Sequence, residues 1–95
     1  MKKIDNWEAL VKGKNEKYEI AIPIPGCYIS GHIEGKETIL ETSYIDLSSL
    51  TAMDLSNNYY QLGNAKESYL KILNEFIEFA KNKEKNAEKE IQHKR

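Results

Sequence analysis

Apolar residues alternate with other residues along the segment 18–33, which is the two-residue period of a β-strand. Pro25 and Gly26 interrupt the alternation, and proline followed by glycine fits the two corners of a type II turn. We therefore predict two antiparallel strands, 18–24 and 27–33, that pair as a hairpin. Tyr18, Cys27 and the isoleucines of both strands would lie on one face and form the core.

A second turn is predicted at 34–37, where a glycine can take a positive φ, as a type II′ turn requires. The segment 38–47 that follows is rich in β-branched residues and predicts a third strand. With a two-residue turn, Leu40 and Tyr44 would join the core face of a three-stranded antiparallel meander.

The N-terminal segment predicts a short helix that ends near Gly13. Asp5 and Glu8 have the spacing of a capping box, in which each side chain bonds to the other residue's amide. The apolar residues are spaced three or four apart, as on one face of a helix. They are Ile4, Trp7, Leu10 and Val11.

The strongest helical pattern follows a second capping box at 64–67. Its apolar stripe has the spacing of an amphipathic helix, which we expect to cover the apolar face of the sheet. The stripe consists of Tyr69, Leu70, Leu73, Phe76, Ile77 and Ala80. The segment 49–61 before it fits either another helix or an irregular linker.

These patterns predict an α+β fold: a short N-terminal helix, a three-stranded antiparallel meander, then one or two helices packed on the sheet. We expect residues 1–81 to be one domain and 82–95 a charged helical or frayed extension. Alternatively, Ala87 and Ile91 could continue the helical stripe into a weak seam with a partner chain.

Composition narrows the class of protein. The 95-residue chain has no apolar run long enough to span a bilayer and begins without the apolar stretch of a signal peptide, so we expect a cytoplasmic protein. Its net charge is −1, and Arg95 is its only arginine. This argues against nucleic acid as a partner, because nucleic-acid contacts usually rely on arginine.

Catalytic chemistry is not indicated by any motif. Cys27 is the only cysteine, which excludes an intrachain disulfide and predicts a buried small apolar side chain. His32 and His93 have no neighbours at metal-ligand spacing, and the glycines form no phosphate-binding loop. We expect no enzyme, no metal and no cofactor.

The best candidate binding surface is the second face of the predicted sheet, opposite the core, because aromatic and hydroxyl groups on a sheet make adaptable contacts. It would carry Tyr28, Ser30, His32, Glu41 and Ser43, with Ile39 and Ile45 beside them. Tyr59 and Tyr60 are further candidates, because a tyrosine ring can stack on a base.

We therefore expect a small non-enzymatic binding protein that self-associates, of the kind phages or mobile elements use to block or sequester a host factor. One alternative is a binding protein for a small nucleotide-type ligand, with a pocket between protomers. Another is a structural protein that assembles through its C-terminal helix.

Overall fold

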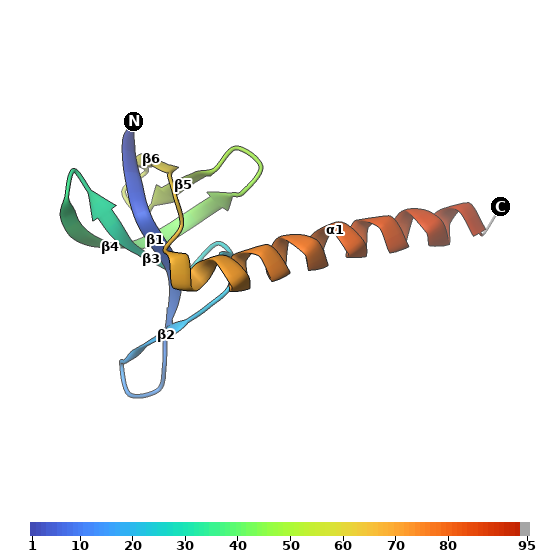
Figure 1. The fold of residues 1–95 in the computed structure, drawn as a ribbon, viewed down its shortest axis with the longest axis horizontal. Coiled ribbons are helices and arrows are strands. Elements are labelled where there is room, and N and C mark those ends of the chain that lie inside the picture. The colour runs from blue at the N-terminus through green and yellow to red at the C-terminus, as the bar shows by residue number, and fades with distance from the viewer. Residues whose placement is uncertain (94–95) are drawn as a thin grey trace.

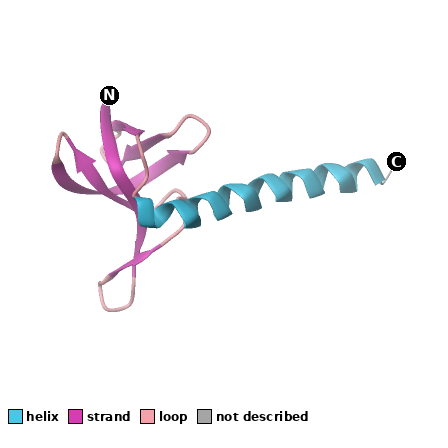
Figure 2. Cartoon of the chain, in the orientation of Figure 1, coloured by secondary structure: helices cyan, strands magenta, loops and turns pink. Residues whose placement is uncertain are grey.

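The fold consists mainly of β-strands, and one long C-terminal helix extends away from them (Figures 1 and 2). The computed structural model describes the backbone of residues 1–93 and the side chains of residues 1–82. The elements are β1 (Lys2–Lys12), β2 (Tyr18–Ile20), β3 (Tyr28–Ile33), β4 (Lys36–Asp46), β5 (Thr51–Asp54), β6 (Tyr59–Leu62), the 3-10 turn η1 (Glu67–Tyr69) and α1 (Leu70–His93).

The sheet closes on itself as a small barrel. Its strand order is β2-β1-β3-β4-β5-β6, and β6 also pairs in parallel with the start of β1. All the other pairs are antiparallel, and β2 is added outside the ring, beside the end of β1. The prediction of a three-stranded meander with flanking helices is therefore wrong.

The predicted N-terminal helix is strand β1. Between Asp5 and Glu8 its ladder with β3 gains one extra residue, and Asn6 takes a φ of 54° there. This bulge lengthens the spacing between inward-facing residues from two to three, which imitates the spacing of a helix. The residues that β1 buries in the core are Ile4, Trp7 and Ala9.

The turn at Pro25 and Gly26 is present, but the predicted hairpin around it is not. The Cys27 amide donates to the Ile24 carbonyl at 3.1 Å and Gly26 has a φ of 96°, as in a type II turn. However, β2 pairs with β1, and β3 lies between β1 and β4. The predicted core face of the first strand is instead exposed at Tyr18, Ile20, Ile22 and Ile24.

The position of the second turn and the pairing of the strands on either side of it were predicted correctly. Ile33 pairs with Lys36 across a two-residue turn, and the register continues through β3 and β4. Glu34 and Gly35 both have positive φ, at 51° and 81°. Positive values at both positions define a type I′ turn, so the expected type II′ was wrong.

A second bulge, in β4, overturns the predicted facing of the strand's end. The ladder with β5 shifts between Thr42 and Tyr44. Beyond the shift Ile45 is buried in the core and Tyr44 is exposed, the reverse of the expectation. A one-residue shift has this effect because side chains alternate between the two faces of a strand.

The segment 49–61 forms strands β5 and β6, neither a helix nor an irregular linker. Aspartates at the ends of β4 and β5 fix the turns, because their carboxylates accept bonds from the following residues. Asp46 accepts from the Ser48 amide at 3.0 Å, and Asp54 accepts from the Asn58 amide at 3.0 Å.

The expected C-terminal helix is present, but it does not cover the sheet. Tyr69, in η1, and Leu73, in the first turns of α1, are buried in the core. Ile72 and Ile77 also pack against the core, and the helix beyond them projects away from the barrel (Figure 1). No helix in the described part of the chain has the length and apolar composition to cross a membrane. The predicted seam at Ala87 and Ile91 concerns side chains outside the described residues.

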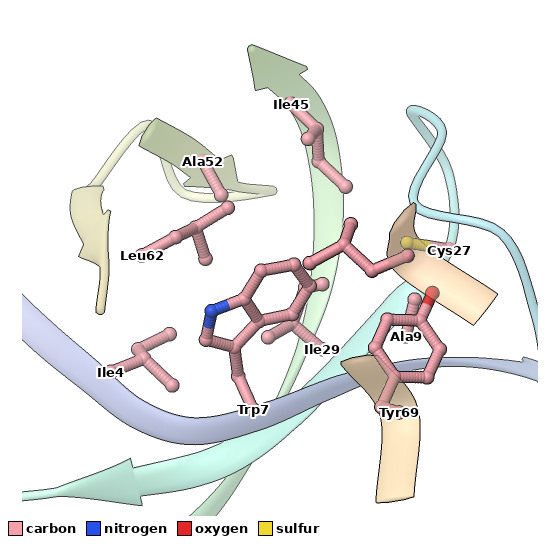
Figure 3. Packing of buried hydrophobic residues seen from close by; sticks show 10 residues of the cluster. Ile4, Trp7, Ala9, Cys27, Ile29, Ile45, Ala52, Leu62 and Tyr69 are labelled. Atoms are coloured by element: carbon pink, nitrogen blue, oxygen red, sulfur yellow. The ribbon is translucent and has the colours of Figure 1, made fainter. Parts of the chain in front are cut away.

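Trp7 lies near the middle of the core (Figure 3). Its ring centroid is 5.8 Å from that of Tyr69, at an interplanar angle of 57°. Its indole Nε1 donates a hydrogen bond to the Gly63 carbonyl at 2.9 Å. The other buried members of the core are Ile4, Ala9, Cys27, Ile29, Ile45, Ala52, Leu62 and Leu73.

Candidate functional site

The register of β3 and β4 brings four of the predicted site residues onto one face. Tyr28 pairs with Glu41, Ser30 pairs with Ile39, and His32 pairs with Glu37. Because Ile29 between them is buried in the core, these residues point outward. We call the surface of β2, β1, β3 and β4 that is turned away from the core the outer face. It carries Leu10, Tyr18, Ile20, Tyr28, Ser30, His32, Ile39 and Glu41.

Aromatic and aliphatic groups make up the centre of the outer face. The rings of Tyr18 and Tyr28 meet edge to face, with centroids 5.3 Å apart. Leu10 of β1 pairs with Tyr28 on one side and with Ile20 on the other, and it is buried. The Lys12 ammonium lies 6.0 Å from the Tyr18 ring centroid. The sequence prediction missed Leu10 and Tyr18, because it assigned the first to a helix and the second to the core.

Polar groups lie beside this centre. His32 is half-buried, and its Nε2 lies 4.0 Å from a carboxylate oxygen of the exposed Glu37. Glu41 is exposed at the opposite end of the same strand pair. Glu8, paired with Ser30, adds a mostly buried carboxylate that lies 3.6 Å from the Lys66 ammonium. The outer face therefore combines an apolar area with one paired carboxylate and the exposed carboxylates of Glu37 and Glu41.

Ser43 does not belong to the outer face. It lies at the bulge of β4, where its hydroxyl bonds to the Asp54 carbonyl at 3.0 Å. A second contact, to the Met53 carbonyl, is 3.4 Å long. Both contacts join β4 to β5, so we assign Ser43 to stabilisation of the bulge.

Tyr59 and Tyr60 lie in β6, far from Tyr28. Tyr60 pairs with Lys2 at one end of β1, whereas Tyr28 pairs with Leu10 near the other. The Tyr60 hydroxyl donates to an Asp54 carboxylate oxygen at 3.0 Å, and burial, followed by this bond, raises the pKa of Tyr60. A polar hollow of about 350 Å³ lies beside them, lined by Met1, Lys2, Asn58, Tyr59 and Tyr60.

Cys27 has the buried environment predicted for it. Its Sγ lies 3.9 Å from the Thr42 hydroxyl, and burial raises the pKa of the thiol. A raised pKa disfavours the thiolate, which is the nucleophilic form. His32 lies on the outer face and Cys27 in the core, so the two do not form a catalytic pair. Among the described residues, no group of three or more His, Cys, Asp or Glu could hold a metal ion.

Tyr69 anchors the loop between β2 and β3. Its side chain is buried beside Trp7, and its hydroxyl donates to the Ala21 carbonyl at 2.5 Å. Burial, as the largest cause, raises the pKa of Tyr69 to about 12. The native state therefore holds this proton more tightly than an unfolded tyrosine, whose pKa is about 10.

We expect Tyr69 to make stability fall at alkaline pH. Its contribution is fully present below a pH of about 10, where both states are protonated, and is lost as the pH rises toward 12. Urea midpoints measured by circular dichroism should therefore fall more steeply above pH 10 for the wild type than for Tyr69→Phe. Tyr59→Phe, at an exposed tyrosine, is the control and should keep the wild-type slope. Parallel profiles for Tyr69→Phe and the wild type would contradict this assignment.

Comparison of the chain with protein-family models, curated proteins and solved structures finds no match. The outer face is therefore interpreted from its own residues and their geometry.

Proposed function

We propose that this chain is a non-enzymatic binding protein that binds another protein through its outer face. The observation that carries the proposal is the half-exposed apolar and aromatic centre of this face. Tyr18 is 45% exposed, Ile20 49% and Ile39 44%, although the barrel has a complete core on its inner side. Aromatic side chains surrounded by polar groups are typical of protein-recognition surfaces.

The chemistry of the outer face favours a protein partner. A paired strand surface changes little on binding, so its tyrosines would be held in place before the partner arrives. Glu37 and Glu41 at the margin favour a partner with basic residues around an apolar centre. An inhibitor that blocks a host factor would act through such a surface, and loss of the partner's activity on binding would identify that role.

A nucleotide-type ligand has less support. The tyrosines that would stack on a base are split between β3 and β6, and Tyr60 already bonds to Asp54. A ligand that binds only the native state raises the melting temperature, so a panel of nucleotides tests this alternative. An assembly role for α1 would require that deletion of residues 82–95 lower the number of chains per assembly, measured as solution mass divided by chain mass.

We expect Ile39→Glu to weaken partner binding at least tenfold. The change places a carboxylate in the apolar centre, where the partner would have to bury it without a counter-charge. The partner would be captured with tagged wild-type protein, produced in pure form and titrated by isothermal calorimetry. Capture alone does not count as support.

Leu55→Glu is the matched control, because Leu55 is exposed on the loop between β5 and β6 and lies outside the outer face. It should bind the purified partner with wild-type affinity. If the partner bound Ile39→Glu with wild-type affinity but bound Leu55→Glu more weakly, the binding surface would lie at the β5–β6 loop and not on the outer face.

A further inference from the structure

β2 is an edge strand whose outward backbone groups have no strand partner in the described chain. It pairs with β1 alone. The Lys17 carbonyl accepts from the amide of Gly13, the residue after β1, at 2.8 Å, and the Ala21 amide donates to the Ala9 carbonyl in β1 at 3.0 Å. Successive residues of a strand point their amides and carbonyls to opposite sides. Tyr18 and Ile20, which lie between those contacts, therefore direct theirs away from β1.

This edge lacks the usual protection against further pairing. Natural edge strands commonly carry charged side chains that block an added strand. Here the residues at alternate positions along the edge are large and apolar. They are Tyr18, Ile20 and Ile22, each exposed by between 43% and 49%.

The first half of β4 provides the contrast. Residues 36–41 pair with β3 and have no second strand neighbour in the described chain. Ile33 and Lys36 close the hairpin as a hydrogen-bonded pair, so every second residue from Lys36 bonds to β3. The backbone amides and carbonyls of Glu37, Ile39 and Glu41 therefore point to the open edge of β4. If two such edges paired around Ile39, Glu37 of each would lie opposite Glu41 of the other. Like charges directly opposite are destabilising, so this edge is protected against self-pairing and β2 is not.

We propose that β2 pairs with the β2 strand of a second copy of this chain, antiparallel and around a twofold axis at Ile20. Ile20 then lies opposite the partner's Ile20, and Tyr18 lies opposite the partner's Ile22. Glu19 lies opposite the partner's Ala21. This register uses the outward-pointing groups of Tyr18, Ile20 and Ile22 for the new hydrogen bonds and leaves the bonds to β1 intact. The Ile22 carbonyl, which already accepts from the Ile24 amide at 3.0 Å, would accept a second bond.

The proposed register is complementary in both packing and charge. Ile20 pairs with Leu10 inside the chain, so the two copies would form a row of four apolar side chains across four strands. Cross-strand apolar pairs of this kind stabilise antiparallel sheets. A shift that centred the axis on Glu19 would bring two carboxylates face to face and would use residues that already bond to β1. The axis is therefore expected at Ile20.

The assembly would stop at two chains. A twofold axis uses the same edge of both copies, so no β2 edge stays open for a third. The proposed pairing ends at Ile22, because the Ile24 amide donates back to the Ile22 carbonyl at 3.0 Å and turns the chain there. The two copies would align their outer faces in one extended sheet.

Solution mass tests the proposal. Light scattering and sedimentation, from low to high micromolar protein, should give twice the 11.0 kDa chain mass for the wild type. Ile20→Lys should give a monomer, because two lysines would meet at the axis. Ile39→Lys, the same change at a similarly exposed isoleucine of β4, should remain a dimer. A monomeric wild type, or a dimer that survives Ile20→Lys, would overturn the proposal.

Cross-linking tests the register independently of stability. Ile20→Cys, made with Cys27→Ser so that it is the only thiol, should form a disulfide-linked dimer under a mild oxidant. Paired residues that exchange hydrogen bonds have Cα atoms about 5.5 Å apart, within the range of a disulfide. Ile39→Cys in the same background should stay monomeric on a denaturing gel. Equal cross-linking of the two variants would contradict pairing through β2.

Discussion

Replacing Trp7 with alanine is expected to lower the free energy of unfolding by about 3–5 kcal/mol, the usual cost of removing a large buried aromatic side chain. Trp7 is 1% exposed and packs against Tyr69 at 5.8 Å. Its indole also donates to the Gly63 carbonyl, which would lose this partner. A domain of this size has only about 5–15 kcal/mol of stability in total. We therefore expect Trp7→Ala to lose a large share of the domain's stability.

Urea unfolding followed by far-ultraviolet circular dichroism measures the effect without using tryptophan as the probe. Trp7→Phe keeps a ring in the core but loses the hydrogen bond, so its cost should be intermediate. Phe79→Ala removes a 66% exposed aromatic side chain from α1 and should change stability by less than about 0.5 kcal/mol. If Trp7→Ala cost no more than Phe79→Ala, Trp7 could not be the centre of the core.

Trp7 also explains why the N-terminal strand was predicted as a helix. Inward-facing residues of a regular strand are two apart, but the bulge at Asn6 places Ile4 and Trp7 three apart. The same four residues, Asp5 to Glu8, match a capping box. Spacing alone cannot separate a bulged strand from a short helix, because both give a spacing of three. The outcome depends on β3 and β6, which lie beside β1 in the barrel.

The pairing of β3 with β4 across its two-residue turn was predictable, and the other pairings of the barrel were not. The turn at Glu34 and Gly35 fixes the register of β3 and β4, because a two-residue turn has few geometries. For this reason Tyr28, Ser30, His32 and Glu41 were correctly predicted to share a face. The parallel pairing of β6 with the start of β1 joins the two ends of the barrel, and no local pattern encodes it.

The exposed isoleucines show the limit of the hydrophobic pattern. Alternation along 18–24 correctly indicated an extended segment with one apolar side. It could not say whether that side meets the same chain or another one. Ile20, Ile22 and Ile24 lie outside the barrel core, and their exposure motivates the proposed pairing of β2 with a second copy.

Gly31 is also expected to tolerate substitution poorly, with Gly31→Ala lowering the free energy of unfolding by about 1–3 kcal/mol. Gly31 is buried in β3, opposite the bulge of β1. An added methyl carbon would lie 2.5 Å from Ile4 Cγ2 and 2.9 Å from the Asp5 carbonyl oxygen. The second contact is with backbone, so β1 and β3 would have to separate where β1 bends to join the two sides of the barrel.

Gly13→Ala is the control for Gly31→Ala, because both changes restrict the unfolded chain equally. A methyl carbon at Gly13 would meet the flexible Glu19 carboxylate at 3.2 Å and the Lys17 carbonyl at 3.4 Å, so little has to move. Without a clash, such a change is neutral or stabilises a protein by up to about 1 kcal/mol. The free energies of unfolding measured in urea should therefore change in opposite directions in the two variants, or differ between them by more than about 1 kcal/mol. Equal midpoints would show that the bulge accommodates a methyl group, and the close approach of β1 to β3 would then not be needed for closure of the barrel.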